Sequence, residues 1–392
     1  MRLGEAYAKA GRHVAAVKAL NHALELNPDD WVCKYFIAEV KHEMGLFEDA
    51  ISLLHGICSD QPDEAGPFVL LSQCHLSLGL AQLADGFQIR AEQSFLFAIQ
   101  VALDIIKRMS GFRMTAWKMI GDAAIHLSNF STFVTGDAIC DVLDAIQYLP
   151  PPDWAEKVVS IIGLPSFPGG ASLTPMTVAT VAIHSYLSQV SLSSPRQATN
   201  QAGWYDLGVS LQTWTLLASK STSTEDMTFI KDKIVEYFKN ALQIEPGNDM
   251  YWIGLGNAYF DAHPKAAQYA YIKALELDGK NAGTWVSLGL LYFHHGDIEL
   301  ANEALYRAQV LDPDNTGAWV GQFLVARANN NQADATLLLE HAVGLSKPVV
   351  GILILNLFHQ GLTSVFPRLR QTTSSHSEYS VLQQRNTSSI EC

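Results

Sequence analysis

The residues best suited to metal chemistry in this sequence are two short clusters of histidine and glutamate. His42 and Glu43 are adjacent, but no second histidine follows four residues after His42, so the H-E-x-x-H zinc pattern is absent. His294 and His295 precede Glu299 and have the residue types to share a metal ion. The simpler interpretation places this second cluster at the polar end of a helix, and we expect no metal there.

The sequence also lacks the motifs of nucleotide binding, acyl transfer and thiol chemistry. Gly254-Leu-Gly256 lacks the third glycine of a dinucleotide-binding loop and continues as Asn-Ala-Tyr, which is typical of a helix. No G-x-S-x-G elbow occurs. The five cysteines are scattered and never stand in C-x-x-C spacing, which indicates reduced thiols: Cys33, Cys58, Cys74, Cys140 and Cys392. We therefore expect no enzyme and no cofactor.

Charge argues against a nucleic-acid-binding surface. The 392 residues include 26 Lys and Arg against 39 Asp and Glu, for a net charge of -13, and no basic run stands out. Residues 1–20 lack the apolar core of a signal peptide, and the longest apolar run, 349–358, is far shorter than the ~20 residues of a membrane span. We expect a soluble protein of the cytoplasm, and also of the nucleus, without membrane or nucleic-acid partners.

A period of about 34 residues runs through the chain. In its first part the period relates Gly11 to Gly45, Ala16 to Ala50, Leu20 to Leu54 and Pro28 to Pro62. Near the C-terminus it relates Trp252, Trp285 and Trp319, then Ala301 to Ala335 and Ala308 to Ala342. This period is that of the helical hairpin called the tetratricopeptide repeat (TPR).

One segment shows how each residue of the repeat serves a hairpin. Its signature residues are Trp285, Leu288, Gly289, Tyr292, Gly296, Ala301, Leu305, Ala308 and Pro313. Apolar residues three and four apart line one face of the first helix. We expect Gly289 where the two helices come closest, and Pro313 to end the second helix because it lacks an N–H. The sequence therefore predicts an all-α fold, a TPR superhelical solenoid of antiparallel helix hairpins.

Eight repeats can be placed, beginning near residues 1, 31, 65, 114, 201, 249, 282 and 316. Residues 1–129 hold repeats one to three and the first helix of repeat four; repeat three carries roughly seven extra residues after Gly79. Residues 130–200 are predicted as an irregular insertion: an extra helix at 141–148, a Pro/Gly-rich loop at 150–175, and the second helix of repeat four at 177–190.

The remaining chain is predicted to hold repeats five to eight in residues 201–349, with a Ser/Thr-rich stretch at 219–224 interrupting repeat five. Residues 350–392 are expected to form a partial helix and a disordered tail, because the Ser/Thr-rich sequence after Gln371 has no period. Neither end shows a polar capping helix, so we expect a piece of a longer array.

Several segments also indicate a narrower family. They are residues 3–12 and 19–28, Cys74-His75-Leu76 with residues 91–98, Ala116-Trp117-Lys118-Met119-Ile120-Gly121-Asp122-Ala123, and Trp204-Tyr205-Asp206-Leu207-Gly208. Together these segments resemble the TPR scaffold subunits of the superkiller (Ski) complex. The resemblance implies a non-catalytic cytosolic scaffold that holds an RNA helicase and WD-repeat subunits and assists exosome-mediated 3′-to-5′ mRNA decay. It brings no catalytic residues, and the tail departs from the family. The alternatives are a TPR adaptor of a chaperone, transport or cell-cycle complex, and an enzyme whose catalytic domain lies outside this chain.

The first helices of a TPR stack line its concave groove, which is the candidate partner-binding site. In repeats one and two the groove positions include Glu5, Glu39 and His42, and the set is acidic. In repeats six to eight the candidate groove residues are apolar: Ile253, Val286, Leu290, Phe293, Val320 and Leu324. Apolar surface at such positions is typical of an interaction site, with Leu290 and Phe293 as the expected anchors. The alternative is that this set packs on another segment of the same chain.

The charge balance generates a first prediction. Because the net charge of -13 opposes phosphate contact, the chain should not bind single-stranded RNA tightly. Fluorescence anisotropy with a labelled single-stranded RNA, measured at two salt concentrations, tests this. Tight binding that weakens steeply with added salt would contradict the prediction.

Overall fold

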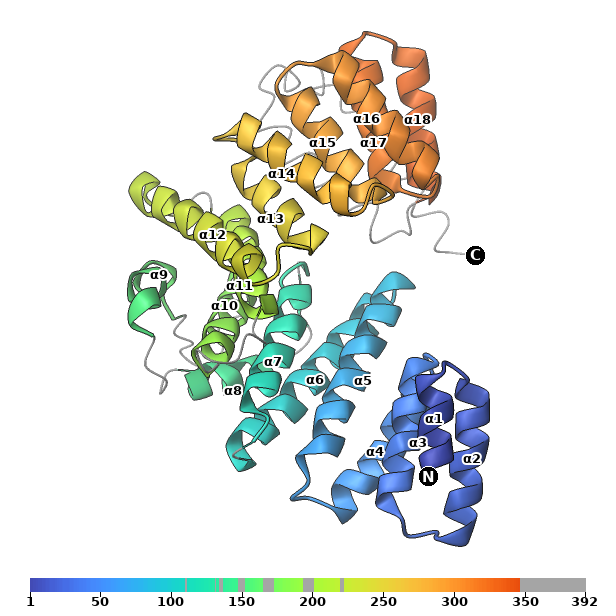
Figure 1. The fold of residues 1–392 in the computed structure, drawn as a ribbon. Coiled ribbons are helices and arrows are strands. Elements are labelled where there is room, and N and C mark those ends of the chain that lie inside the picture. Colours follow the sequence, from blue (N-terminus) through green and yellow to red (C-terminus); the bar gives the residue numbers. More distant parts are fainter. Residues whose placement is uncertain are drawn as a thin grey trace. The chain divides into compact units, whose positions relative to one another are not determined.

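The computed structural model describes residues 1–109, 111–130, 132–133, 137–146, 152–164, 173–192, 201–218 and 222–345. Every regular element in these ranges is a helix, as Figure 1 shows. The predicted all-α fold of helical hairpins is therefore confirmed. The predicted partial helix and tail, residues 350–392, lie outside the described residues, as do 219–221 and, within the predicted loop at 150–175, residues 150–151 and 165–172.

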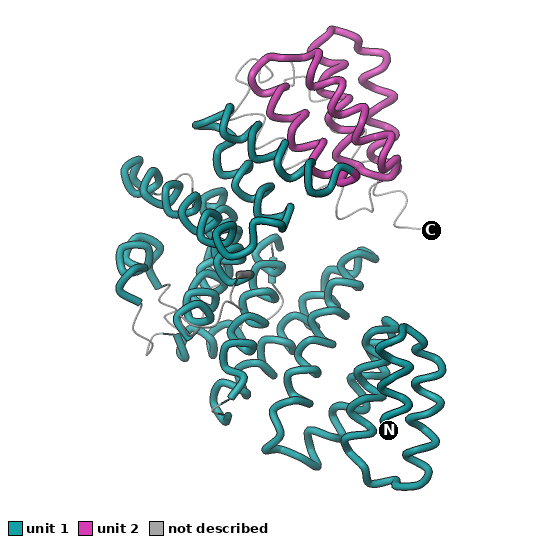
Figure 2. The backbone as a smooth tube through the Cα atoms, viewed as in Figure 1, with its two compact units in different colours: residues 1–279 teal, residues 280–392 magenta. Residues whose placement is uncertain are grey.

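The chain divides into two compact units, residues 1–279 and 280–392 (Figure 2). The first unit contains α1 (Arg2–Lys9), α2 (His13–Leu26), α3 (Trp31–Glu43), α4 (Phe47–Asp60), α5 (Ala65–Ala84), α6 (Gln88–Arg108), α7 (Arg113–Leu127), α8 (Asp137–Ile146), the 3-10 helix η1 (Asp153–Ala155), α9 (Glu156–Ile162), α10 (Pro175–Leu192), α11 (Gln201–Ala218), α12 (Thr224–Ile244), α13 (Asp249–Tyr259) and α14 (Pro264–Leu277). The second contains α15 (Ala282–His294), α16 (Ile298–Leu311), α17 (Thr316–Ala328) and α18 (Gln332–Leu345).

Most helices pair with the next one along the chain, from α1 with α2 to α17 with α18. Repeat four is the exception, because α7 pairs with α10 and the chain forms α8, η1 and α9 in between. First helices of neighbouring repeats also touch: α3 with α5, α5 with α7, α7 with α11, α11 with α13, and in the second unit α15 with α17. Each unit is thus a stack of hairpins whose first helices adjoin.

In six of the hairpins that the structure describes, a glycine of the first helix faces a large side chain of the second helix. A Cβ atom added to Gly289 would lie 2.6 Å from Leu305 Cγ and 3.3 Å from the carbonyl oxygen of Ala301. The same pairing recurs between Gly4 and Leu20, Gly79 and Phe95, Gly121 and Tyr186, Gly208 and Phe238, and Gly256 and Tyr271. The expectation that Gly289 marks the closest approach of two helices is confirmed.

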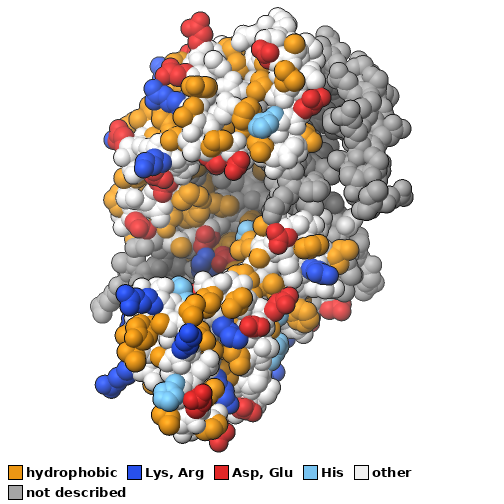
Figure 3. Space-filling view, turned by 90° about the vertical axis from the view of Figure 1, so that its right-hand side faces the viewer, with side chains coloured by type: hydrophobic (Ala, Val, Ile, Leu, Met, Phe, Trp, Pro, Cys, Tyr) orange, Lys and Arg blue, Asp and Glu red, His pale blue; other side chains and the backbone are white. Residues whose placement is uncertain are grey.

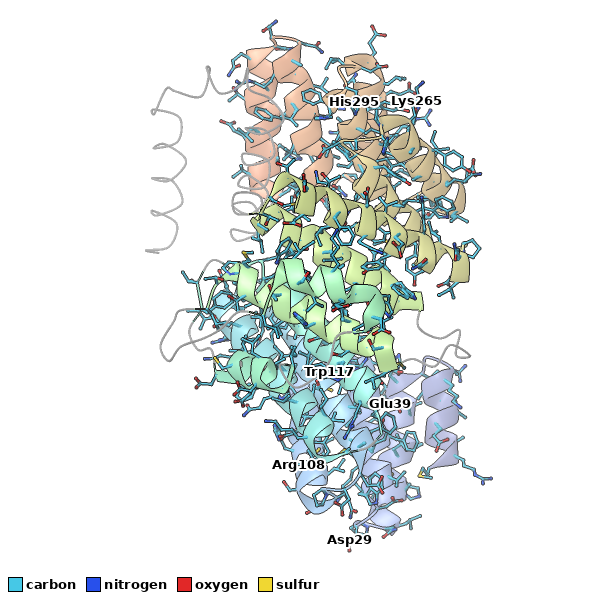
Figure 4. The ribbon with its side chains drawn as sticks, turned by 90° about the vertical axis from the view of Figure 1, so that its left-hand side faces the viewer. Asp29, Glu39, Arg108, Trp117, Lys265 and His295 are labelled. Atoms are coloured by element: carbon cyan, nitrogen blue, oxygen red, sulfur yellow. The ribbon has the colours of Figure 1, made fainter. Side chains whose placement is uncertain are left out.

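The periodic tryptophans serve the connections between repeats. The indole Nε1 of Trp319 donates a hydrogen bond of 2.7 Å to the carbonyl oxygen of Pro313, and Trp252 does the same to Pro246 at 2.9 Å. Each prolyl carbonyl lies in the turn before the tryptophan's own helix, beyond the reach of helical hydrogen bonds. Trp117, on α7, is only 3% exposed (Figure 4). These three tryptophans therefore hold structure together and are not open stacking platforms.

The extra residues of repeat three do not form a loop. They lengthen both helices, so that α5 has 20 residues and α6 has 21, against 13 in α3 and 14 in α4. By length and composition α5 is the one helix of the described residues that could cross a membrane. Its residues Leu70, Leu71 and Cys74 are buried, as in a core helix.

The insertion of repeat four contains more helix than predicted. The extra helix begins at Asp137, earlier than expected, and residues 153–162 of the predicted loop form η1 and α9. Ala155, Val158 and Ile162 are buried at spacings of three and four, the pattern of a helix that covers other structure. The residue before Ala155 in the sequence, Trp154, packs against Trp204, with ring centroids 5.0 Å apart. The sequence predicted a loop here because three consecutive prolines precede the segment, although a short apolar stripe of helical spacing follows them.

The glycine crossing generates a second prediction. Gly289→Leu should destabilise the α15–α16 hairpin by about 1–3 kcal/mol, because overpacking a close crossing displaces Leu305. Gly56→Leu is the matched control, because Gly56 is also inside a helix but an added Cβ there meets nothing within 4 Å. Amide hydrogen exchange in the α15–α16 hairpin and in the α3–α4 hairpin measures the local loss of stability in each variant. Equal protection of α15 and α16 in the Gly289 variant and the unaltered chain would contradict the prediction.

Candidate protein-binding surface

The predicted groove residues of the second unit are mostly core residues. Val286, Phe293, Val320 and Leu324 are 9%, 8%, 4% and 4% exposed. Leu290 is only partly buried and packs against the hydrophobic cluster that contains Val286, Phe293 and Leu324. The expectation of an exposed apolar patch is therefore wrong for the four buried side chains. Their binding role stays a prediction.

The physical reason is that α15 packs on more than one side. It contacts its hairpin partner α16 and also the first helix of the next repeat, α17. Val286 and Phe293 belong to the hydrophobic cluster that these helices share, together with Leu324 of α17. Apolar residues all round a helix indicate burial on all sides, and the sequence alone does not say which neighbour covers which side.

In the first unit, Ile253 on α13 is likewise only partly buried. The acidic positions predicted for repeats one and two do lie near one another. Burial raises the pKa of Glu39 on α3 (Figure 4), and the carboxylates of Glu43 and Glu5 raise it further. His42 Nε2 lies 3.0 Å from Ser77 Oγ of α5, and burial lowers the pKa of this imidazole. The first helices of these repeats therefore carry a group of carboxylates that repel one another.

A cavity opens further along the first helices, where α5, α7 and α11 adjoin and α10 closes one side. Its volume is about 250 Å³, and it is lined by Leu76 and Leu80 of α5, Asp122, Ile125 and His126 of α7, Tyr186 of α10, and Tyr205, Asp206 and Val209 of α11. Drug-sized ligands need about 300–1,000 Å³, so this cavity suits a smaller group.

An ion network forms the polar side of this cavity. Lys118 Nζ donates hydrogen bonds to Asp122 Oδ1 at 3.0 Å and to Asp206 Oδ2 at 2.9 Å. Tyr186 donates its hydroxyl proton to the same Oδ1 of Asp122 at 2.9 Å. Two carboxylates thus share one ammonium group, and the network has one negative charge in excess.

Burial shapes the charges of the network. Burial acts to lower the pKa of Lys118, but Asp122 and Asp206 more than reverse it, and the pKa is raised. Burial raises the pKa of Asp206, whose side chain is 17% exposed; Lys118 lowers this pKa and Asp122 raises it. The ammonium group is therefore held charged, while Asp206 is a carboxylate that lacks full compensation.

Sequence reasoning quoted Lys118, Asp122 and Asp206 within the family resemblance but gave them no role. A signal was present, since Lys118 and Asp122 stand four residues apart on one helix. Asp206 lies 88 positions from Lys118, and only the pairing of α7 with α10 across the insertion brings the two together.

Metal and thiol chemistry find no site in the described residues. No group of three or more His, Cys, Asp or Glu there could hold a metal ion. His294 and His295 meet edge to face at the end of α15, with ring centroids 4.8 Å apart, and Figure 4 labels His295 there. Burial raises the pKa of Cys74 to about 12 and of Cys58 to about 11, so both thiols stay protonated at neutral pH.

Charged side chains of both signs are interspersed with hydrophobic ones over the face seen in Figure 3. The described part of that face shows no continuous field of Lys and Arg. The described part of this face therefore has a mixed charge.

Comparison with known proteins finds the same repeat and several related sequences. A tetratricopeptide repeat family model matches residues 7–67. Superkiller protein 3 of Schizosaccharomyces pombe is 30% identical over 257 residues, 65% of this chain and 18% of that protein. Superkiller complex protein 3 of Mus musculus is 27% identical over 356 residues, 89% of this chain and 21% of that protein.

A further relative, tetratricopeptide repeat protein 37 of Xenopus laevis, is 27% identical over 359 residues, 89% of this chain and 21% of that protein. The chain thus spans about a fifth of the length of these relatives. Among solved structures, a tetratricopeptide repeat protein from Parabacteroides merdae matches 83% of this chain and 96% of its own, at 11% identity and a TM-score of 0.47. The chain therefore matches the tetratricopeptide-repeat model in residues 7–67 and is similar in sequence to superkiller protein 3 and its relatives over 65% to 89% of the chain.

Proposed function

We propose that this chain is a non-catalytic scaffold segment of a superkiller-type complex that assists exosome-mediated 3′-to-5′ decay of mRNA in the cytoplasm. The observation that carries the proposal is the similarity to superkiller protein 3, which extends over 65% to 89% of the chain. TPR hairpins and names such as superkiller complex protein support a role in holding proteins together. The expected partners are an RNA helicase and WD-repeat subunits.

The contact surface we favour is the accessible side of the first helices. These helices adjoin from repeat to repeat, so a partner segment can follow several of them in succession. In the second unit, Leu290 is the groove candidate that keeps a partly exposed side chain. Leu290 is therefore our candidate anchor, and Phe293 supports the helix beneath it from within the core.

A co-purification experiment tests the proposed function. The full chain, tagged and expressed in cells of its own source, should retain an RNA helicase together with a WD-repeat protein from a native extract. Mass spectrometry of the eluate identifies the partners. Recovery of chaperones, transport factors or cell-cycle subunits in place of that pair would contradict the proposal and favour the adaptor alternative.

Two substitutions in α15 should separate anchoring from folding. Leu290→Glu should keep the helical fold and reduce capture of the partner, because it places a charge at a partly exposed apolar contact. Phe293→Glu should lower stability by at least about 3 kcal/mol, because it removes a buried ring and buries a charge.

The matched control is Leu337→Glu, which makes the same change on α18 at a side chain that is 64% exposed. It should leave both fold and capture unchanged. Circular dichroism, thermal melting and partner capture are measured on all three variants. Full capture by a folded Leu290→Glu chain would show that the partner docks elsewhere.

A further inference from the structure

The cavity at the junction of α5, α7, α10 and α11 combines apolar walls with an incompletely compensated pair of carboxylates. We propose that it binds one arginine side chain presented by a protein partner, with the guanidinium group seated on Asp122 and Asp206. The inference rests on the proposed scaffold function, because it assigns a partner chemistry to the surface of the first helices.

The walls of the cavity fit the stem of a long basic side chain. Leu76 and Leu80 of α5, Ile125 of α7 and Val209 of α11 supply apolar surface around a volume of about 250 Å³. Arginine buries its three methylene groups along such surface while its charged head reaches a polar partner. A cavity of this size holds one side chain rather than a cofactor.

The polar end offers two acceptor atoms that the protein leaves open. Asp122 accepts its hydrogen bonds from Lys118 and Tyr186 at Oδ1, and Asp206 accepts from Lys118 at Oδ2. Within the described part of the chain no hydrogen bond reaches Asp122 Oδ2 or Asp206 Oδ1. Both residues line the cavity. A planar guanidinium group presents several N–H donors in a fixed fork, so it has enough donors for both oxygens.

The charge balance of the network selects the sign of the ligand. Two aspartates share one lysine, and the adjoining Asp206 is only 17% exposed, so the excess negative charge is poorly solvated. A cationic ligand relieves that cost, whereas an anion would add to it. Burial also lowers the pKa of the nearby His126, which leaves this imidazole neutral at neutral pH and removes a competing positive charge.

The geometry also favours arginine over a metal ion or lysine. A hard metal cation needs six or more oxygen ligands, and here the ammonium group of Lys118 already lies between the two carboxylates. A second ammonium group would place another compact point charge beside the first. Guanidinium spreads its charge over a plane and is less strongly hydrated, so it enters a half-buried site at lower cost.

Tyr186 fixes the position of one of the two acceptors, Asp122. Its ring is 2% exposed and faces Gly121, so the tyrosine is held by the hairpin crossing itself. Its hydroxyl then orients the Asp122 carboxylate from the opposite helix. The site is thus built on rigid elements before any partner arrives, which reduces the entropic cost of binding.

A titration with small probes tests the site without knowledge of the partner. The full chain, labelled at its isoleucine, leucine and valine methyl groups, is titrated with Nα-acetyl-argininamide, Nα-acetyl-lysinamide and Nα-acetyl-citrullinamide. The methyl signals of Ile125 and Val209 report on the cavity walls. We expect saturable shifts of these signals with the arginine probe, weaker binding of the lysine probe, and no saturable shift with citrulline, which has the same shape without the charge.

Substitutions then test whether the Asp206 carboxylate binds the arginine probe. Asp206→Asn should weaken binding of the arginine probe by about 10-fold or more, the effect of losing one charged hydrogen-bonding partner. Asp232→Asn on α12 is the matched control, because it makes the same charge change at an exposed carboxylate. It should leave the affinity for the arginine probe unchanged. If Asp206→Asn does not fold, the comparison of arginine with citrulline on the unaltered chain decides the matter.

Three results would overturn the inference: equal shifts with arginine and citrulline, equal affinity for arginine and lysine, or unchanged affinity in a folded Asp206→Asn chain. The same titration is independent of helicase capture. Failure of the probe with successful capture removes the arginine site alone, and success of the probe without capture removes the proposed complex alone.

Discussion

The close crossing of two helices within each hairpin is the contact on which the rest of the structure depends. Gly289 has no side chain, so Leu305 can lie where its Cβ would be, and the same exchange of small for large recurs along the array. The crossing fixes the angle of the second helix and so the place where the next repeat can stack. The contacts between successive first helices, such as α5 with α7, follow from it. In six hairpins a single glycine of the first helix therefore sets the packing on which the stacking of the first helices depends.

The insertion of repeat four shows how strong this constraint is. The chain leaves α7 at Leu127, forms three further helical segments, and still brings α10 back onto α7 with Tyr186 over Gly121. Because the residue opposite Gly121 is a tyrosine, the pairing also carries a hydroxyl group to Asp122. The irregular repeat thus keeps the packing rule and adds a polar group that the leucine crossings of Gly4 and Gly289 lack. The tyrosine joins the hairpin crossing to the charged side of the cavity.

The sequence reveals the parts of this molecule that repeat and conceals those that do not. The 34-residue period predicted the helical hairpins. The glycine at the crossing was predictable because only a small residue lets the two helices of a hairpin come so close. The short helix α9 was missed because the prolines before it outweighed Ala155, Val158 and Ile162. The burial of Phe293 was missed because a helix that is apolar all round does not reveal which side is free. Asp206 could not be joined to Lys118 without knowing that α10 closes the hairpin.

Regular and irregular repeats use their first helices differently. In the regular repeats the apolar positions of α15 and α17 are used for stacking, which leaves few side chains such as Leu290 at a surface. In repeats three to five the helices are longer and α5 and α11 hold almost no charged residues, Asp206 being the exception. Asp206 is partly buried and paired with Lys118, which it shares with Asp122. Burying a charge is costly unless it is compensated, so a carboxylate pair at an accessible cavity needs a more specific explanation than exposed charges do. The regular repeats thus use their apolar positions for stacking, whereas the irregular ones place charged groups beside a cavity.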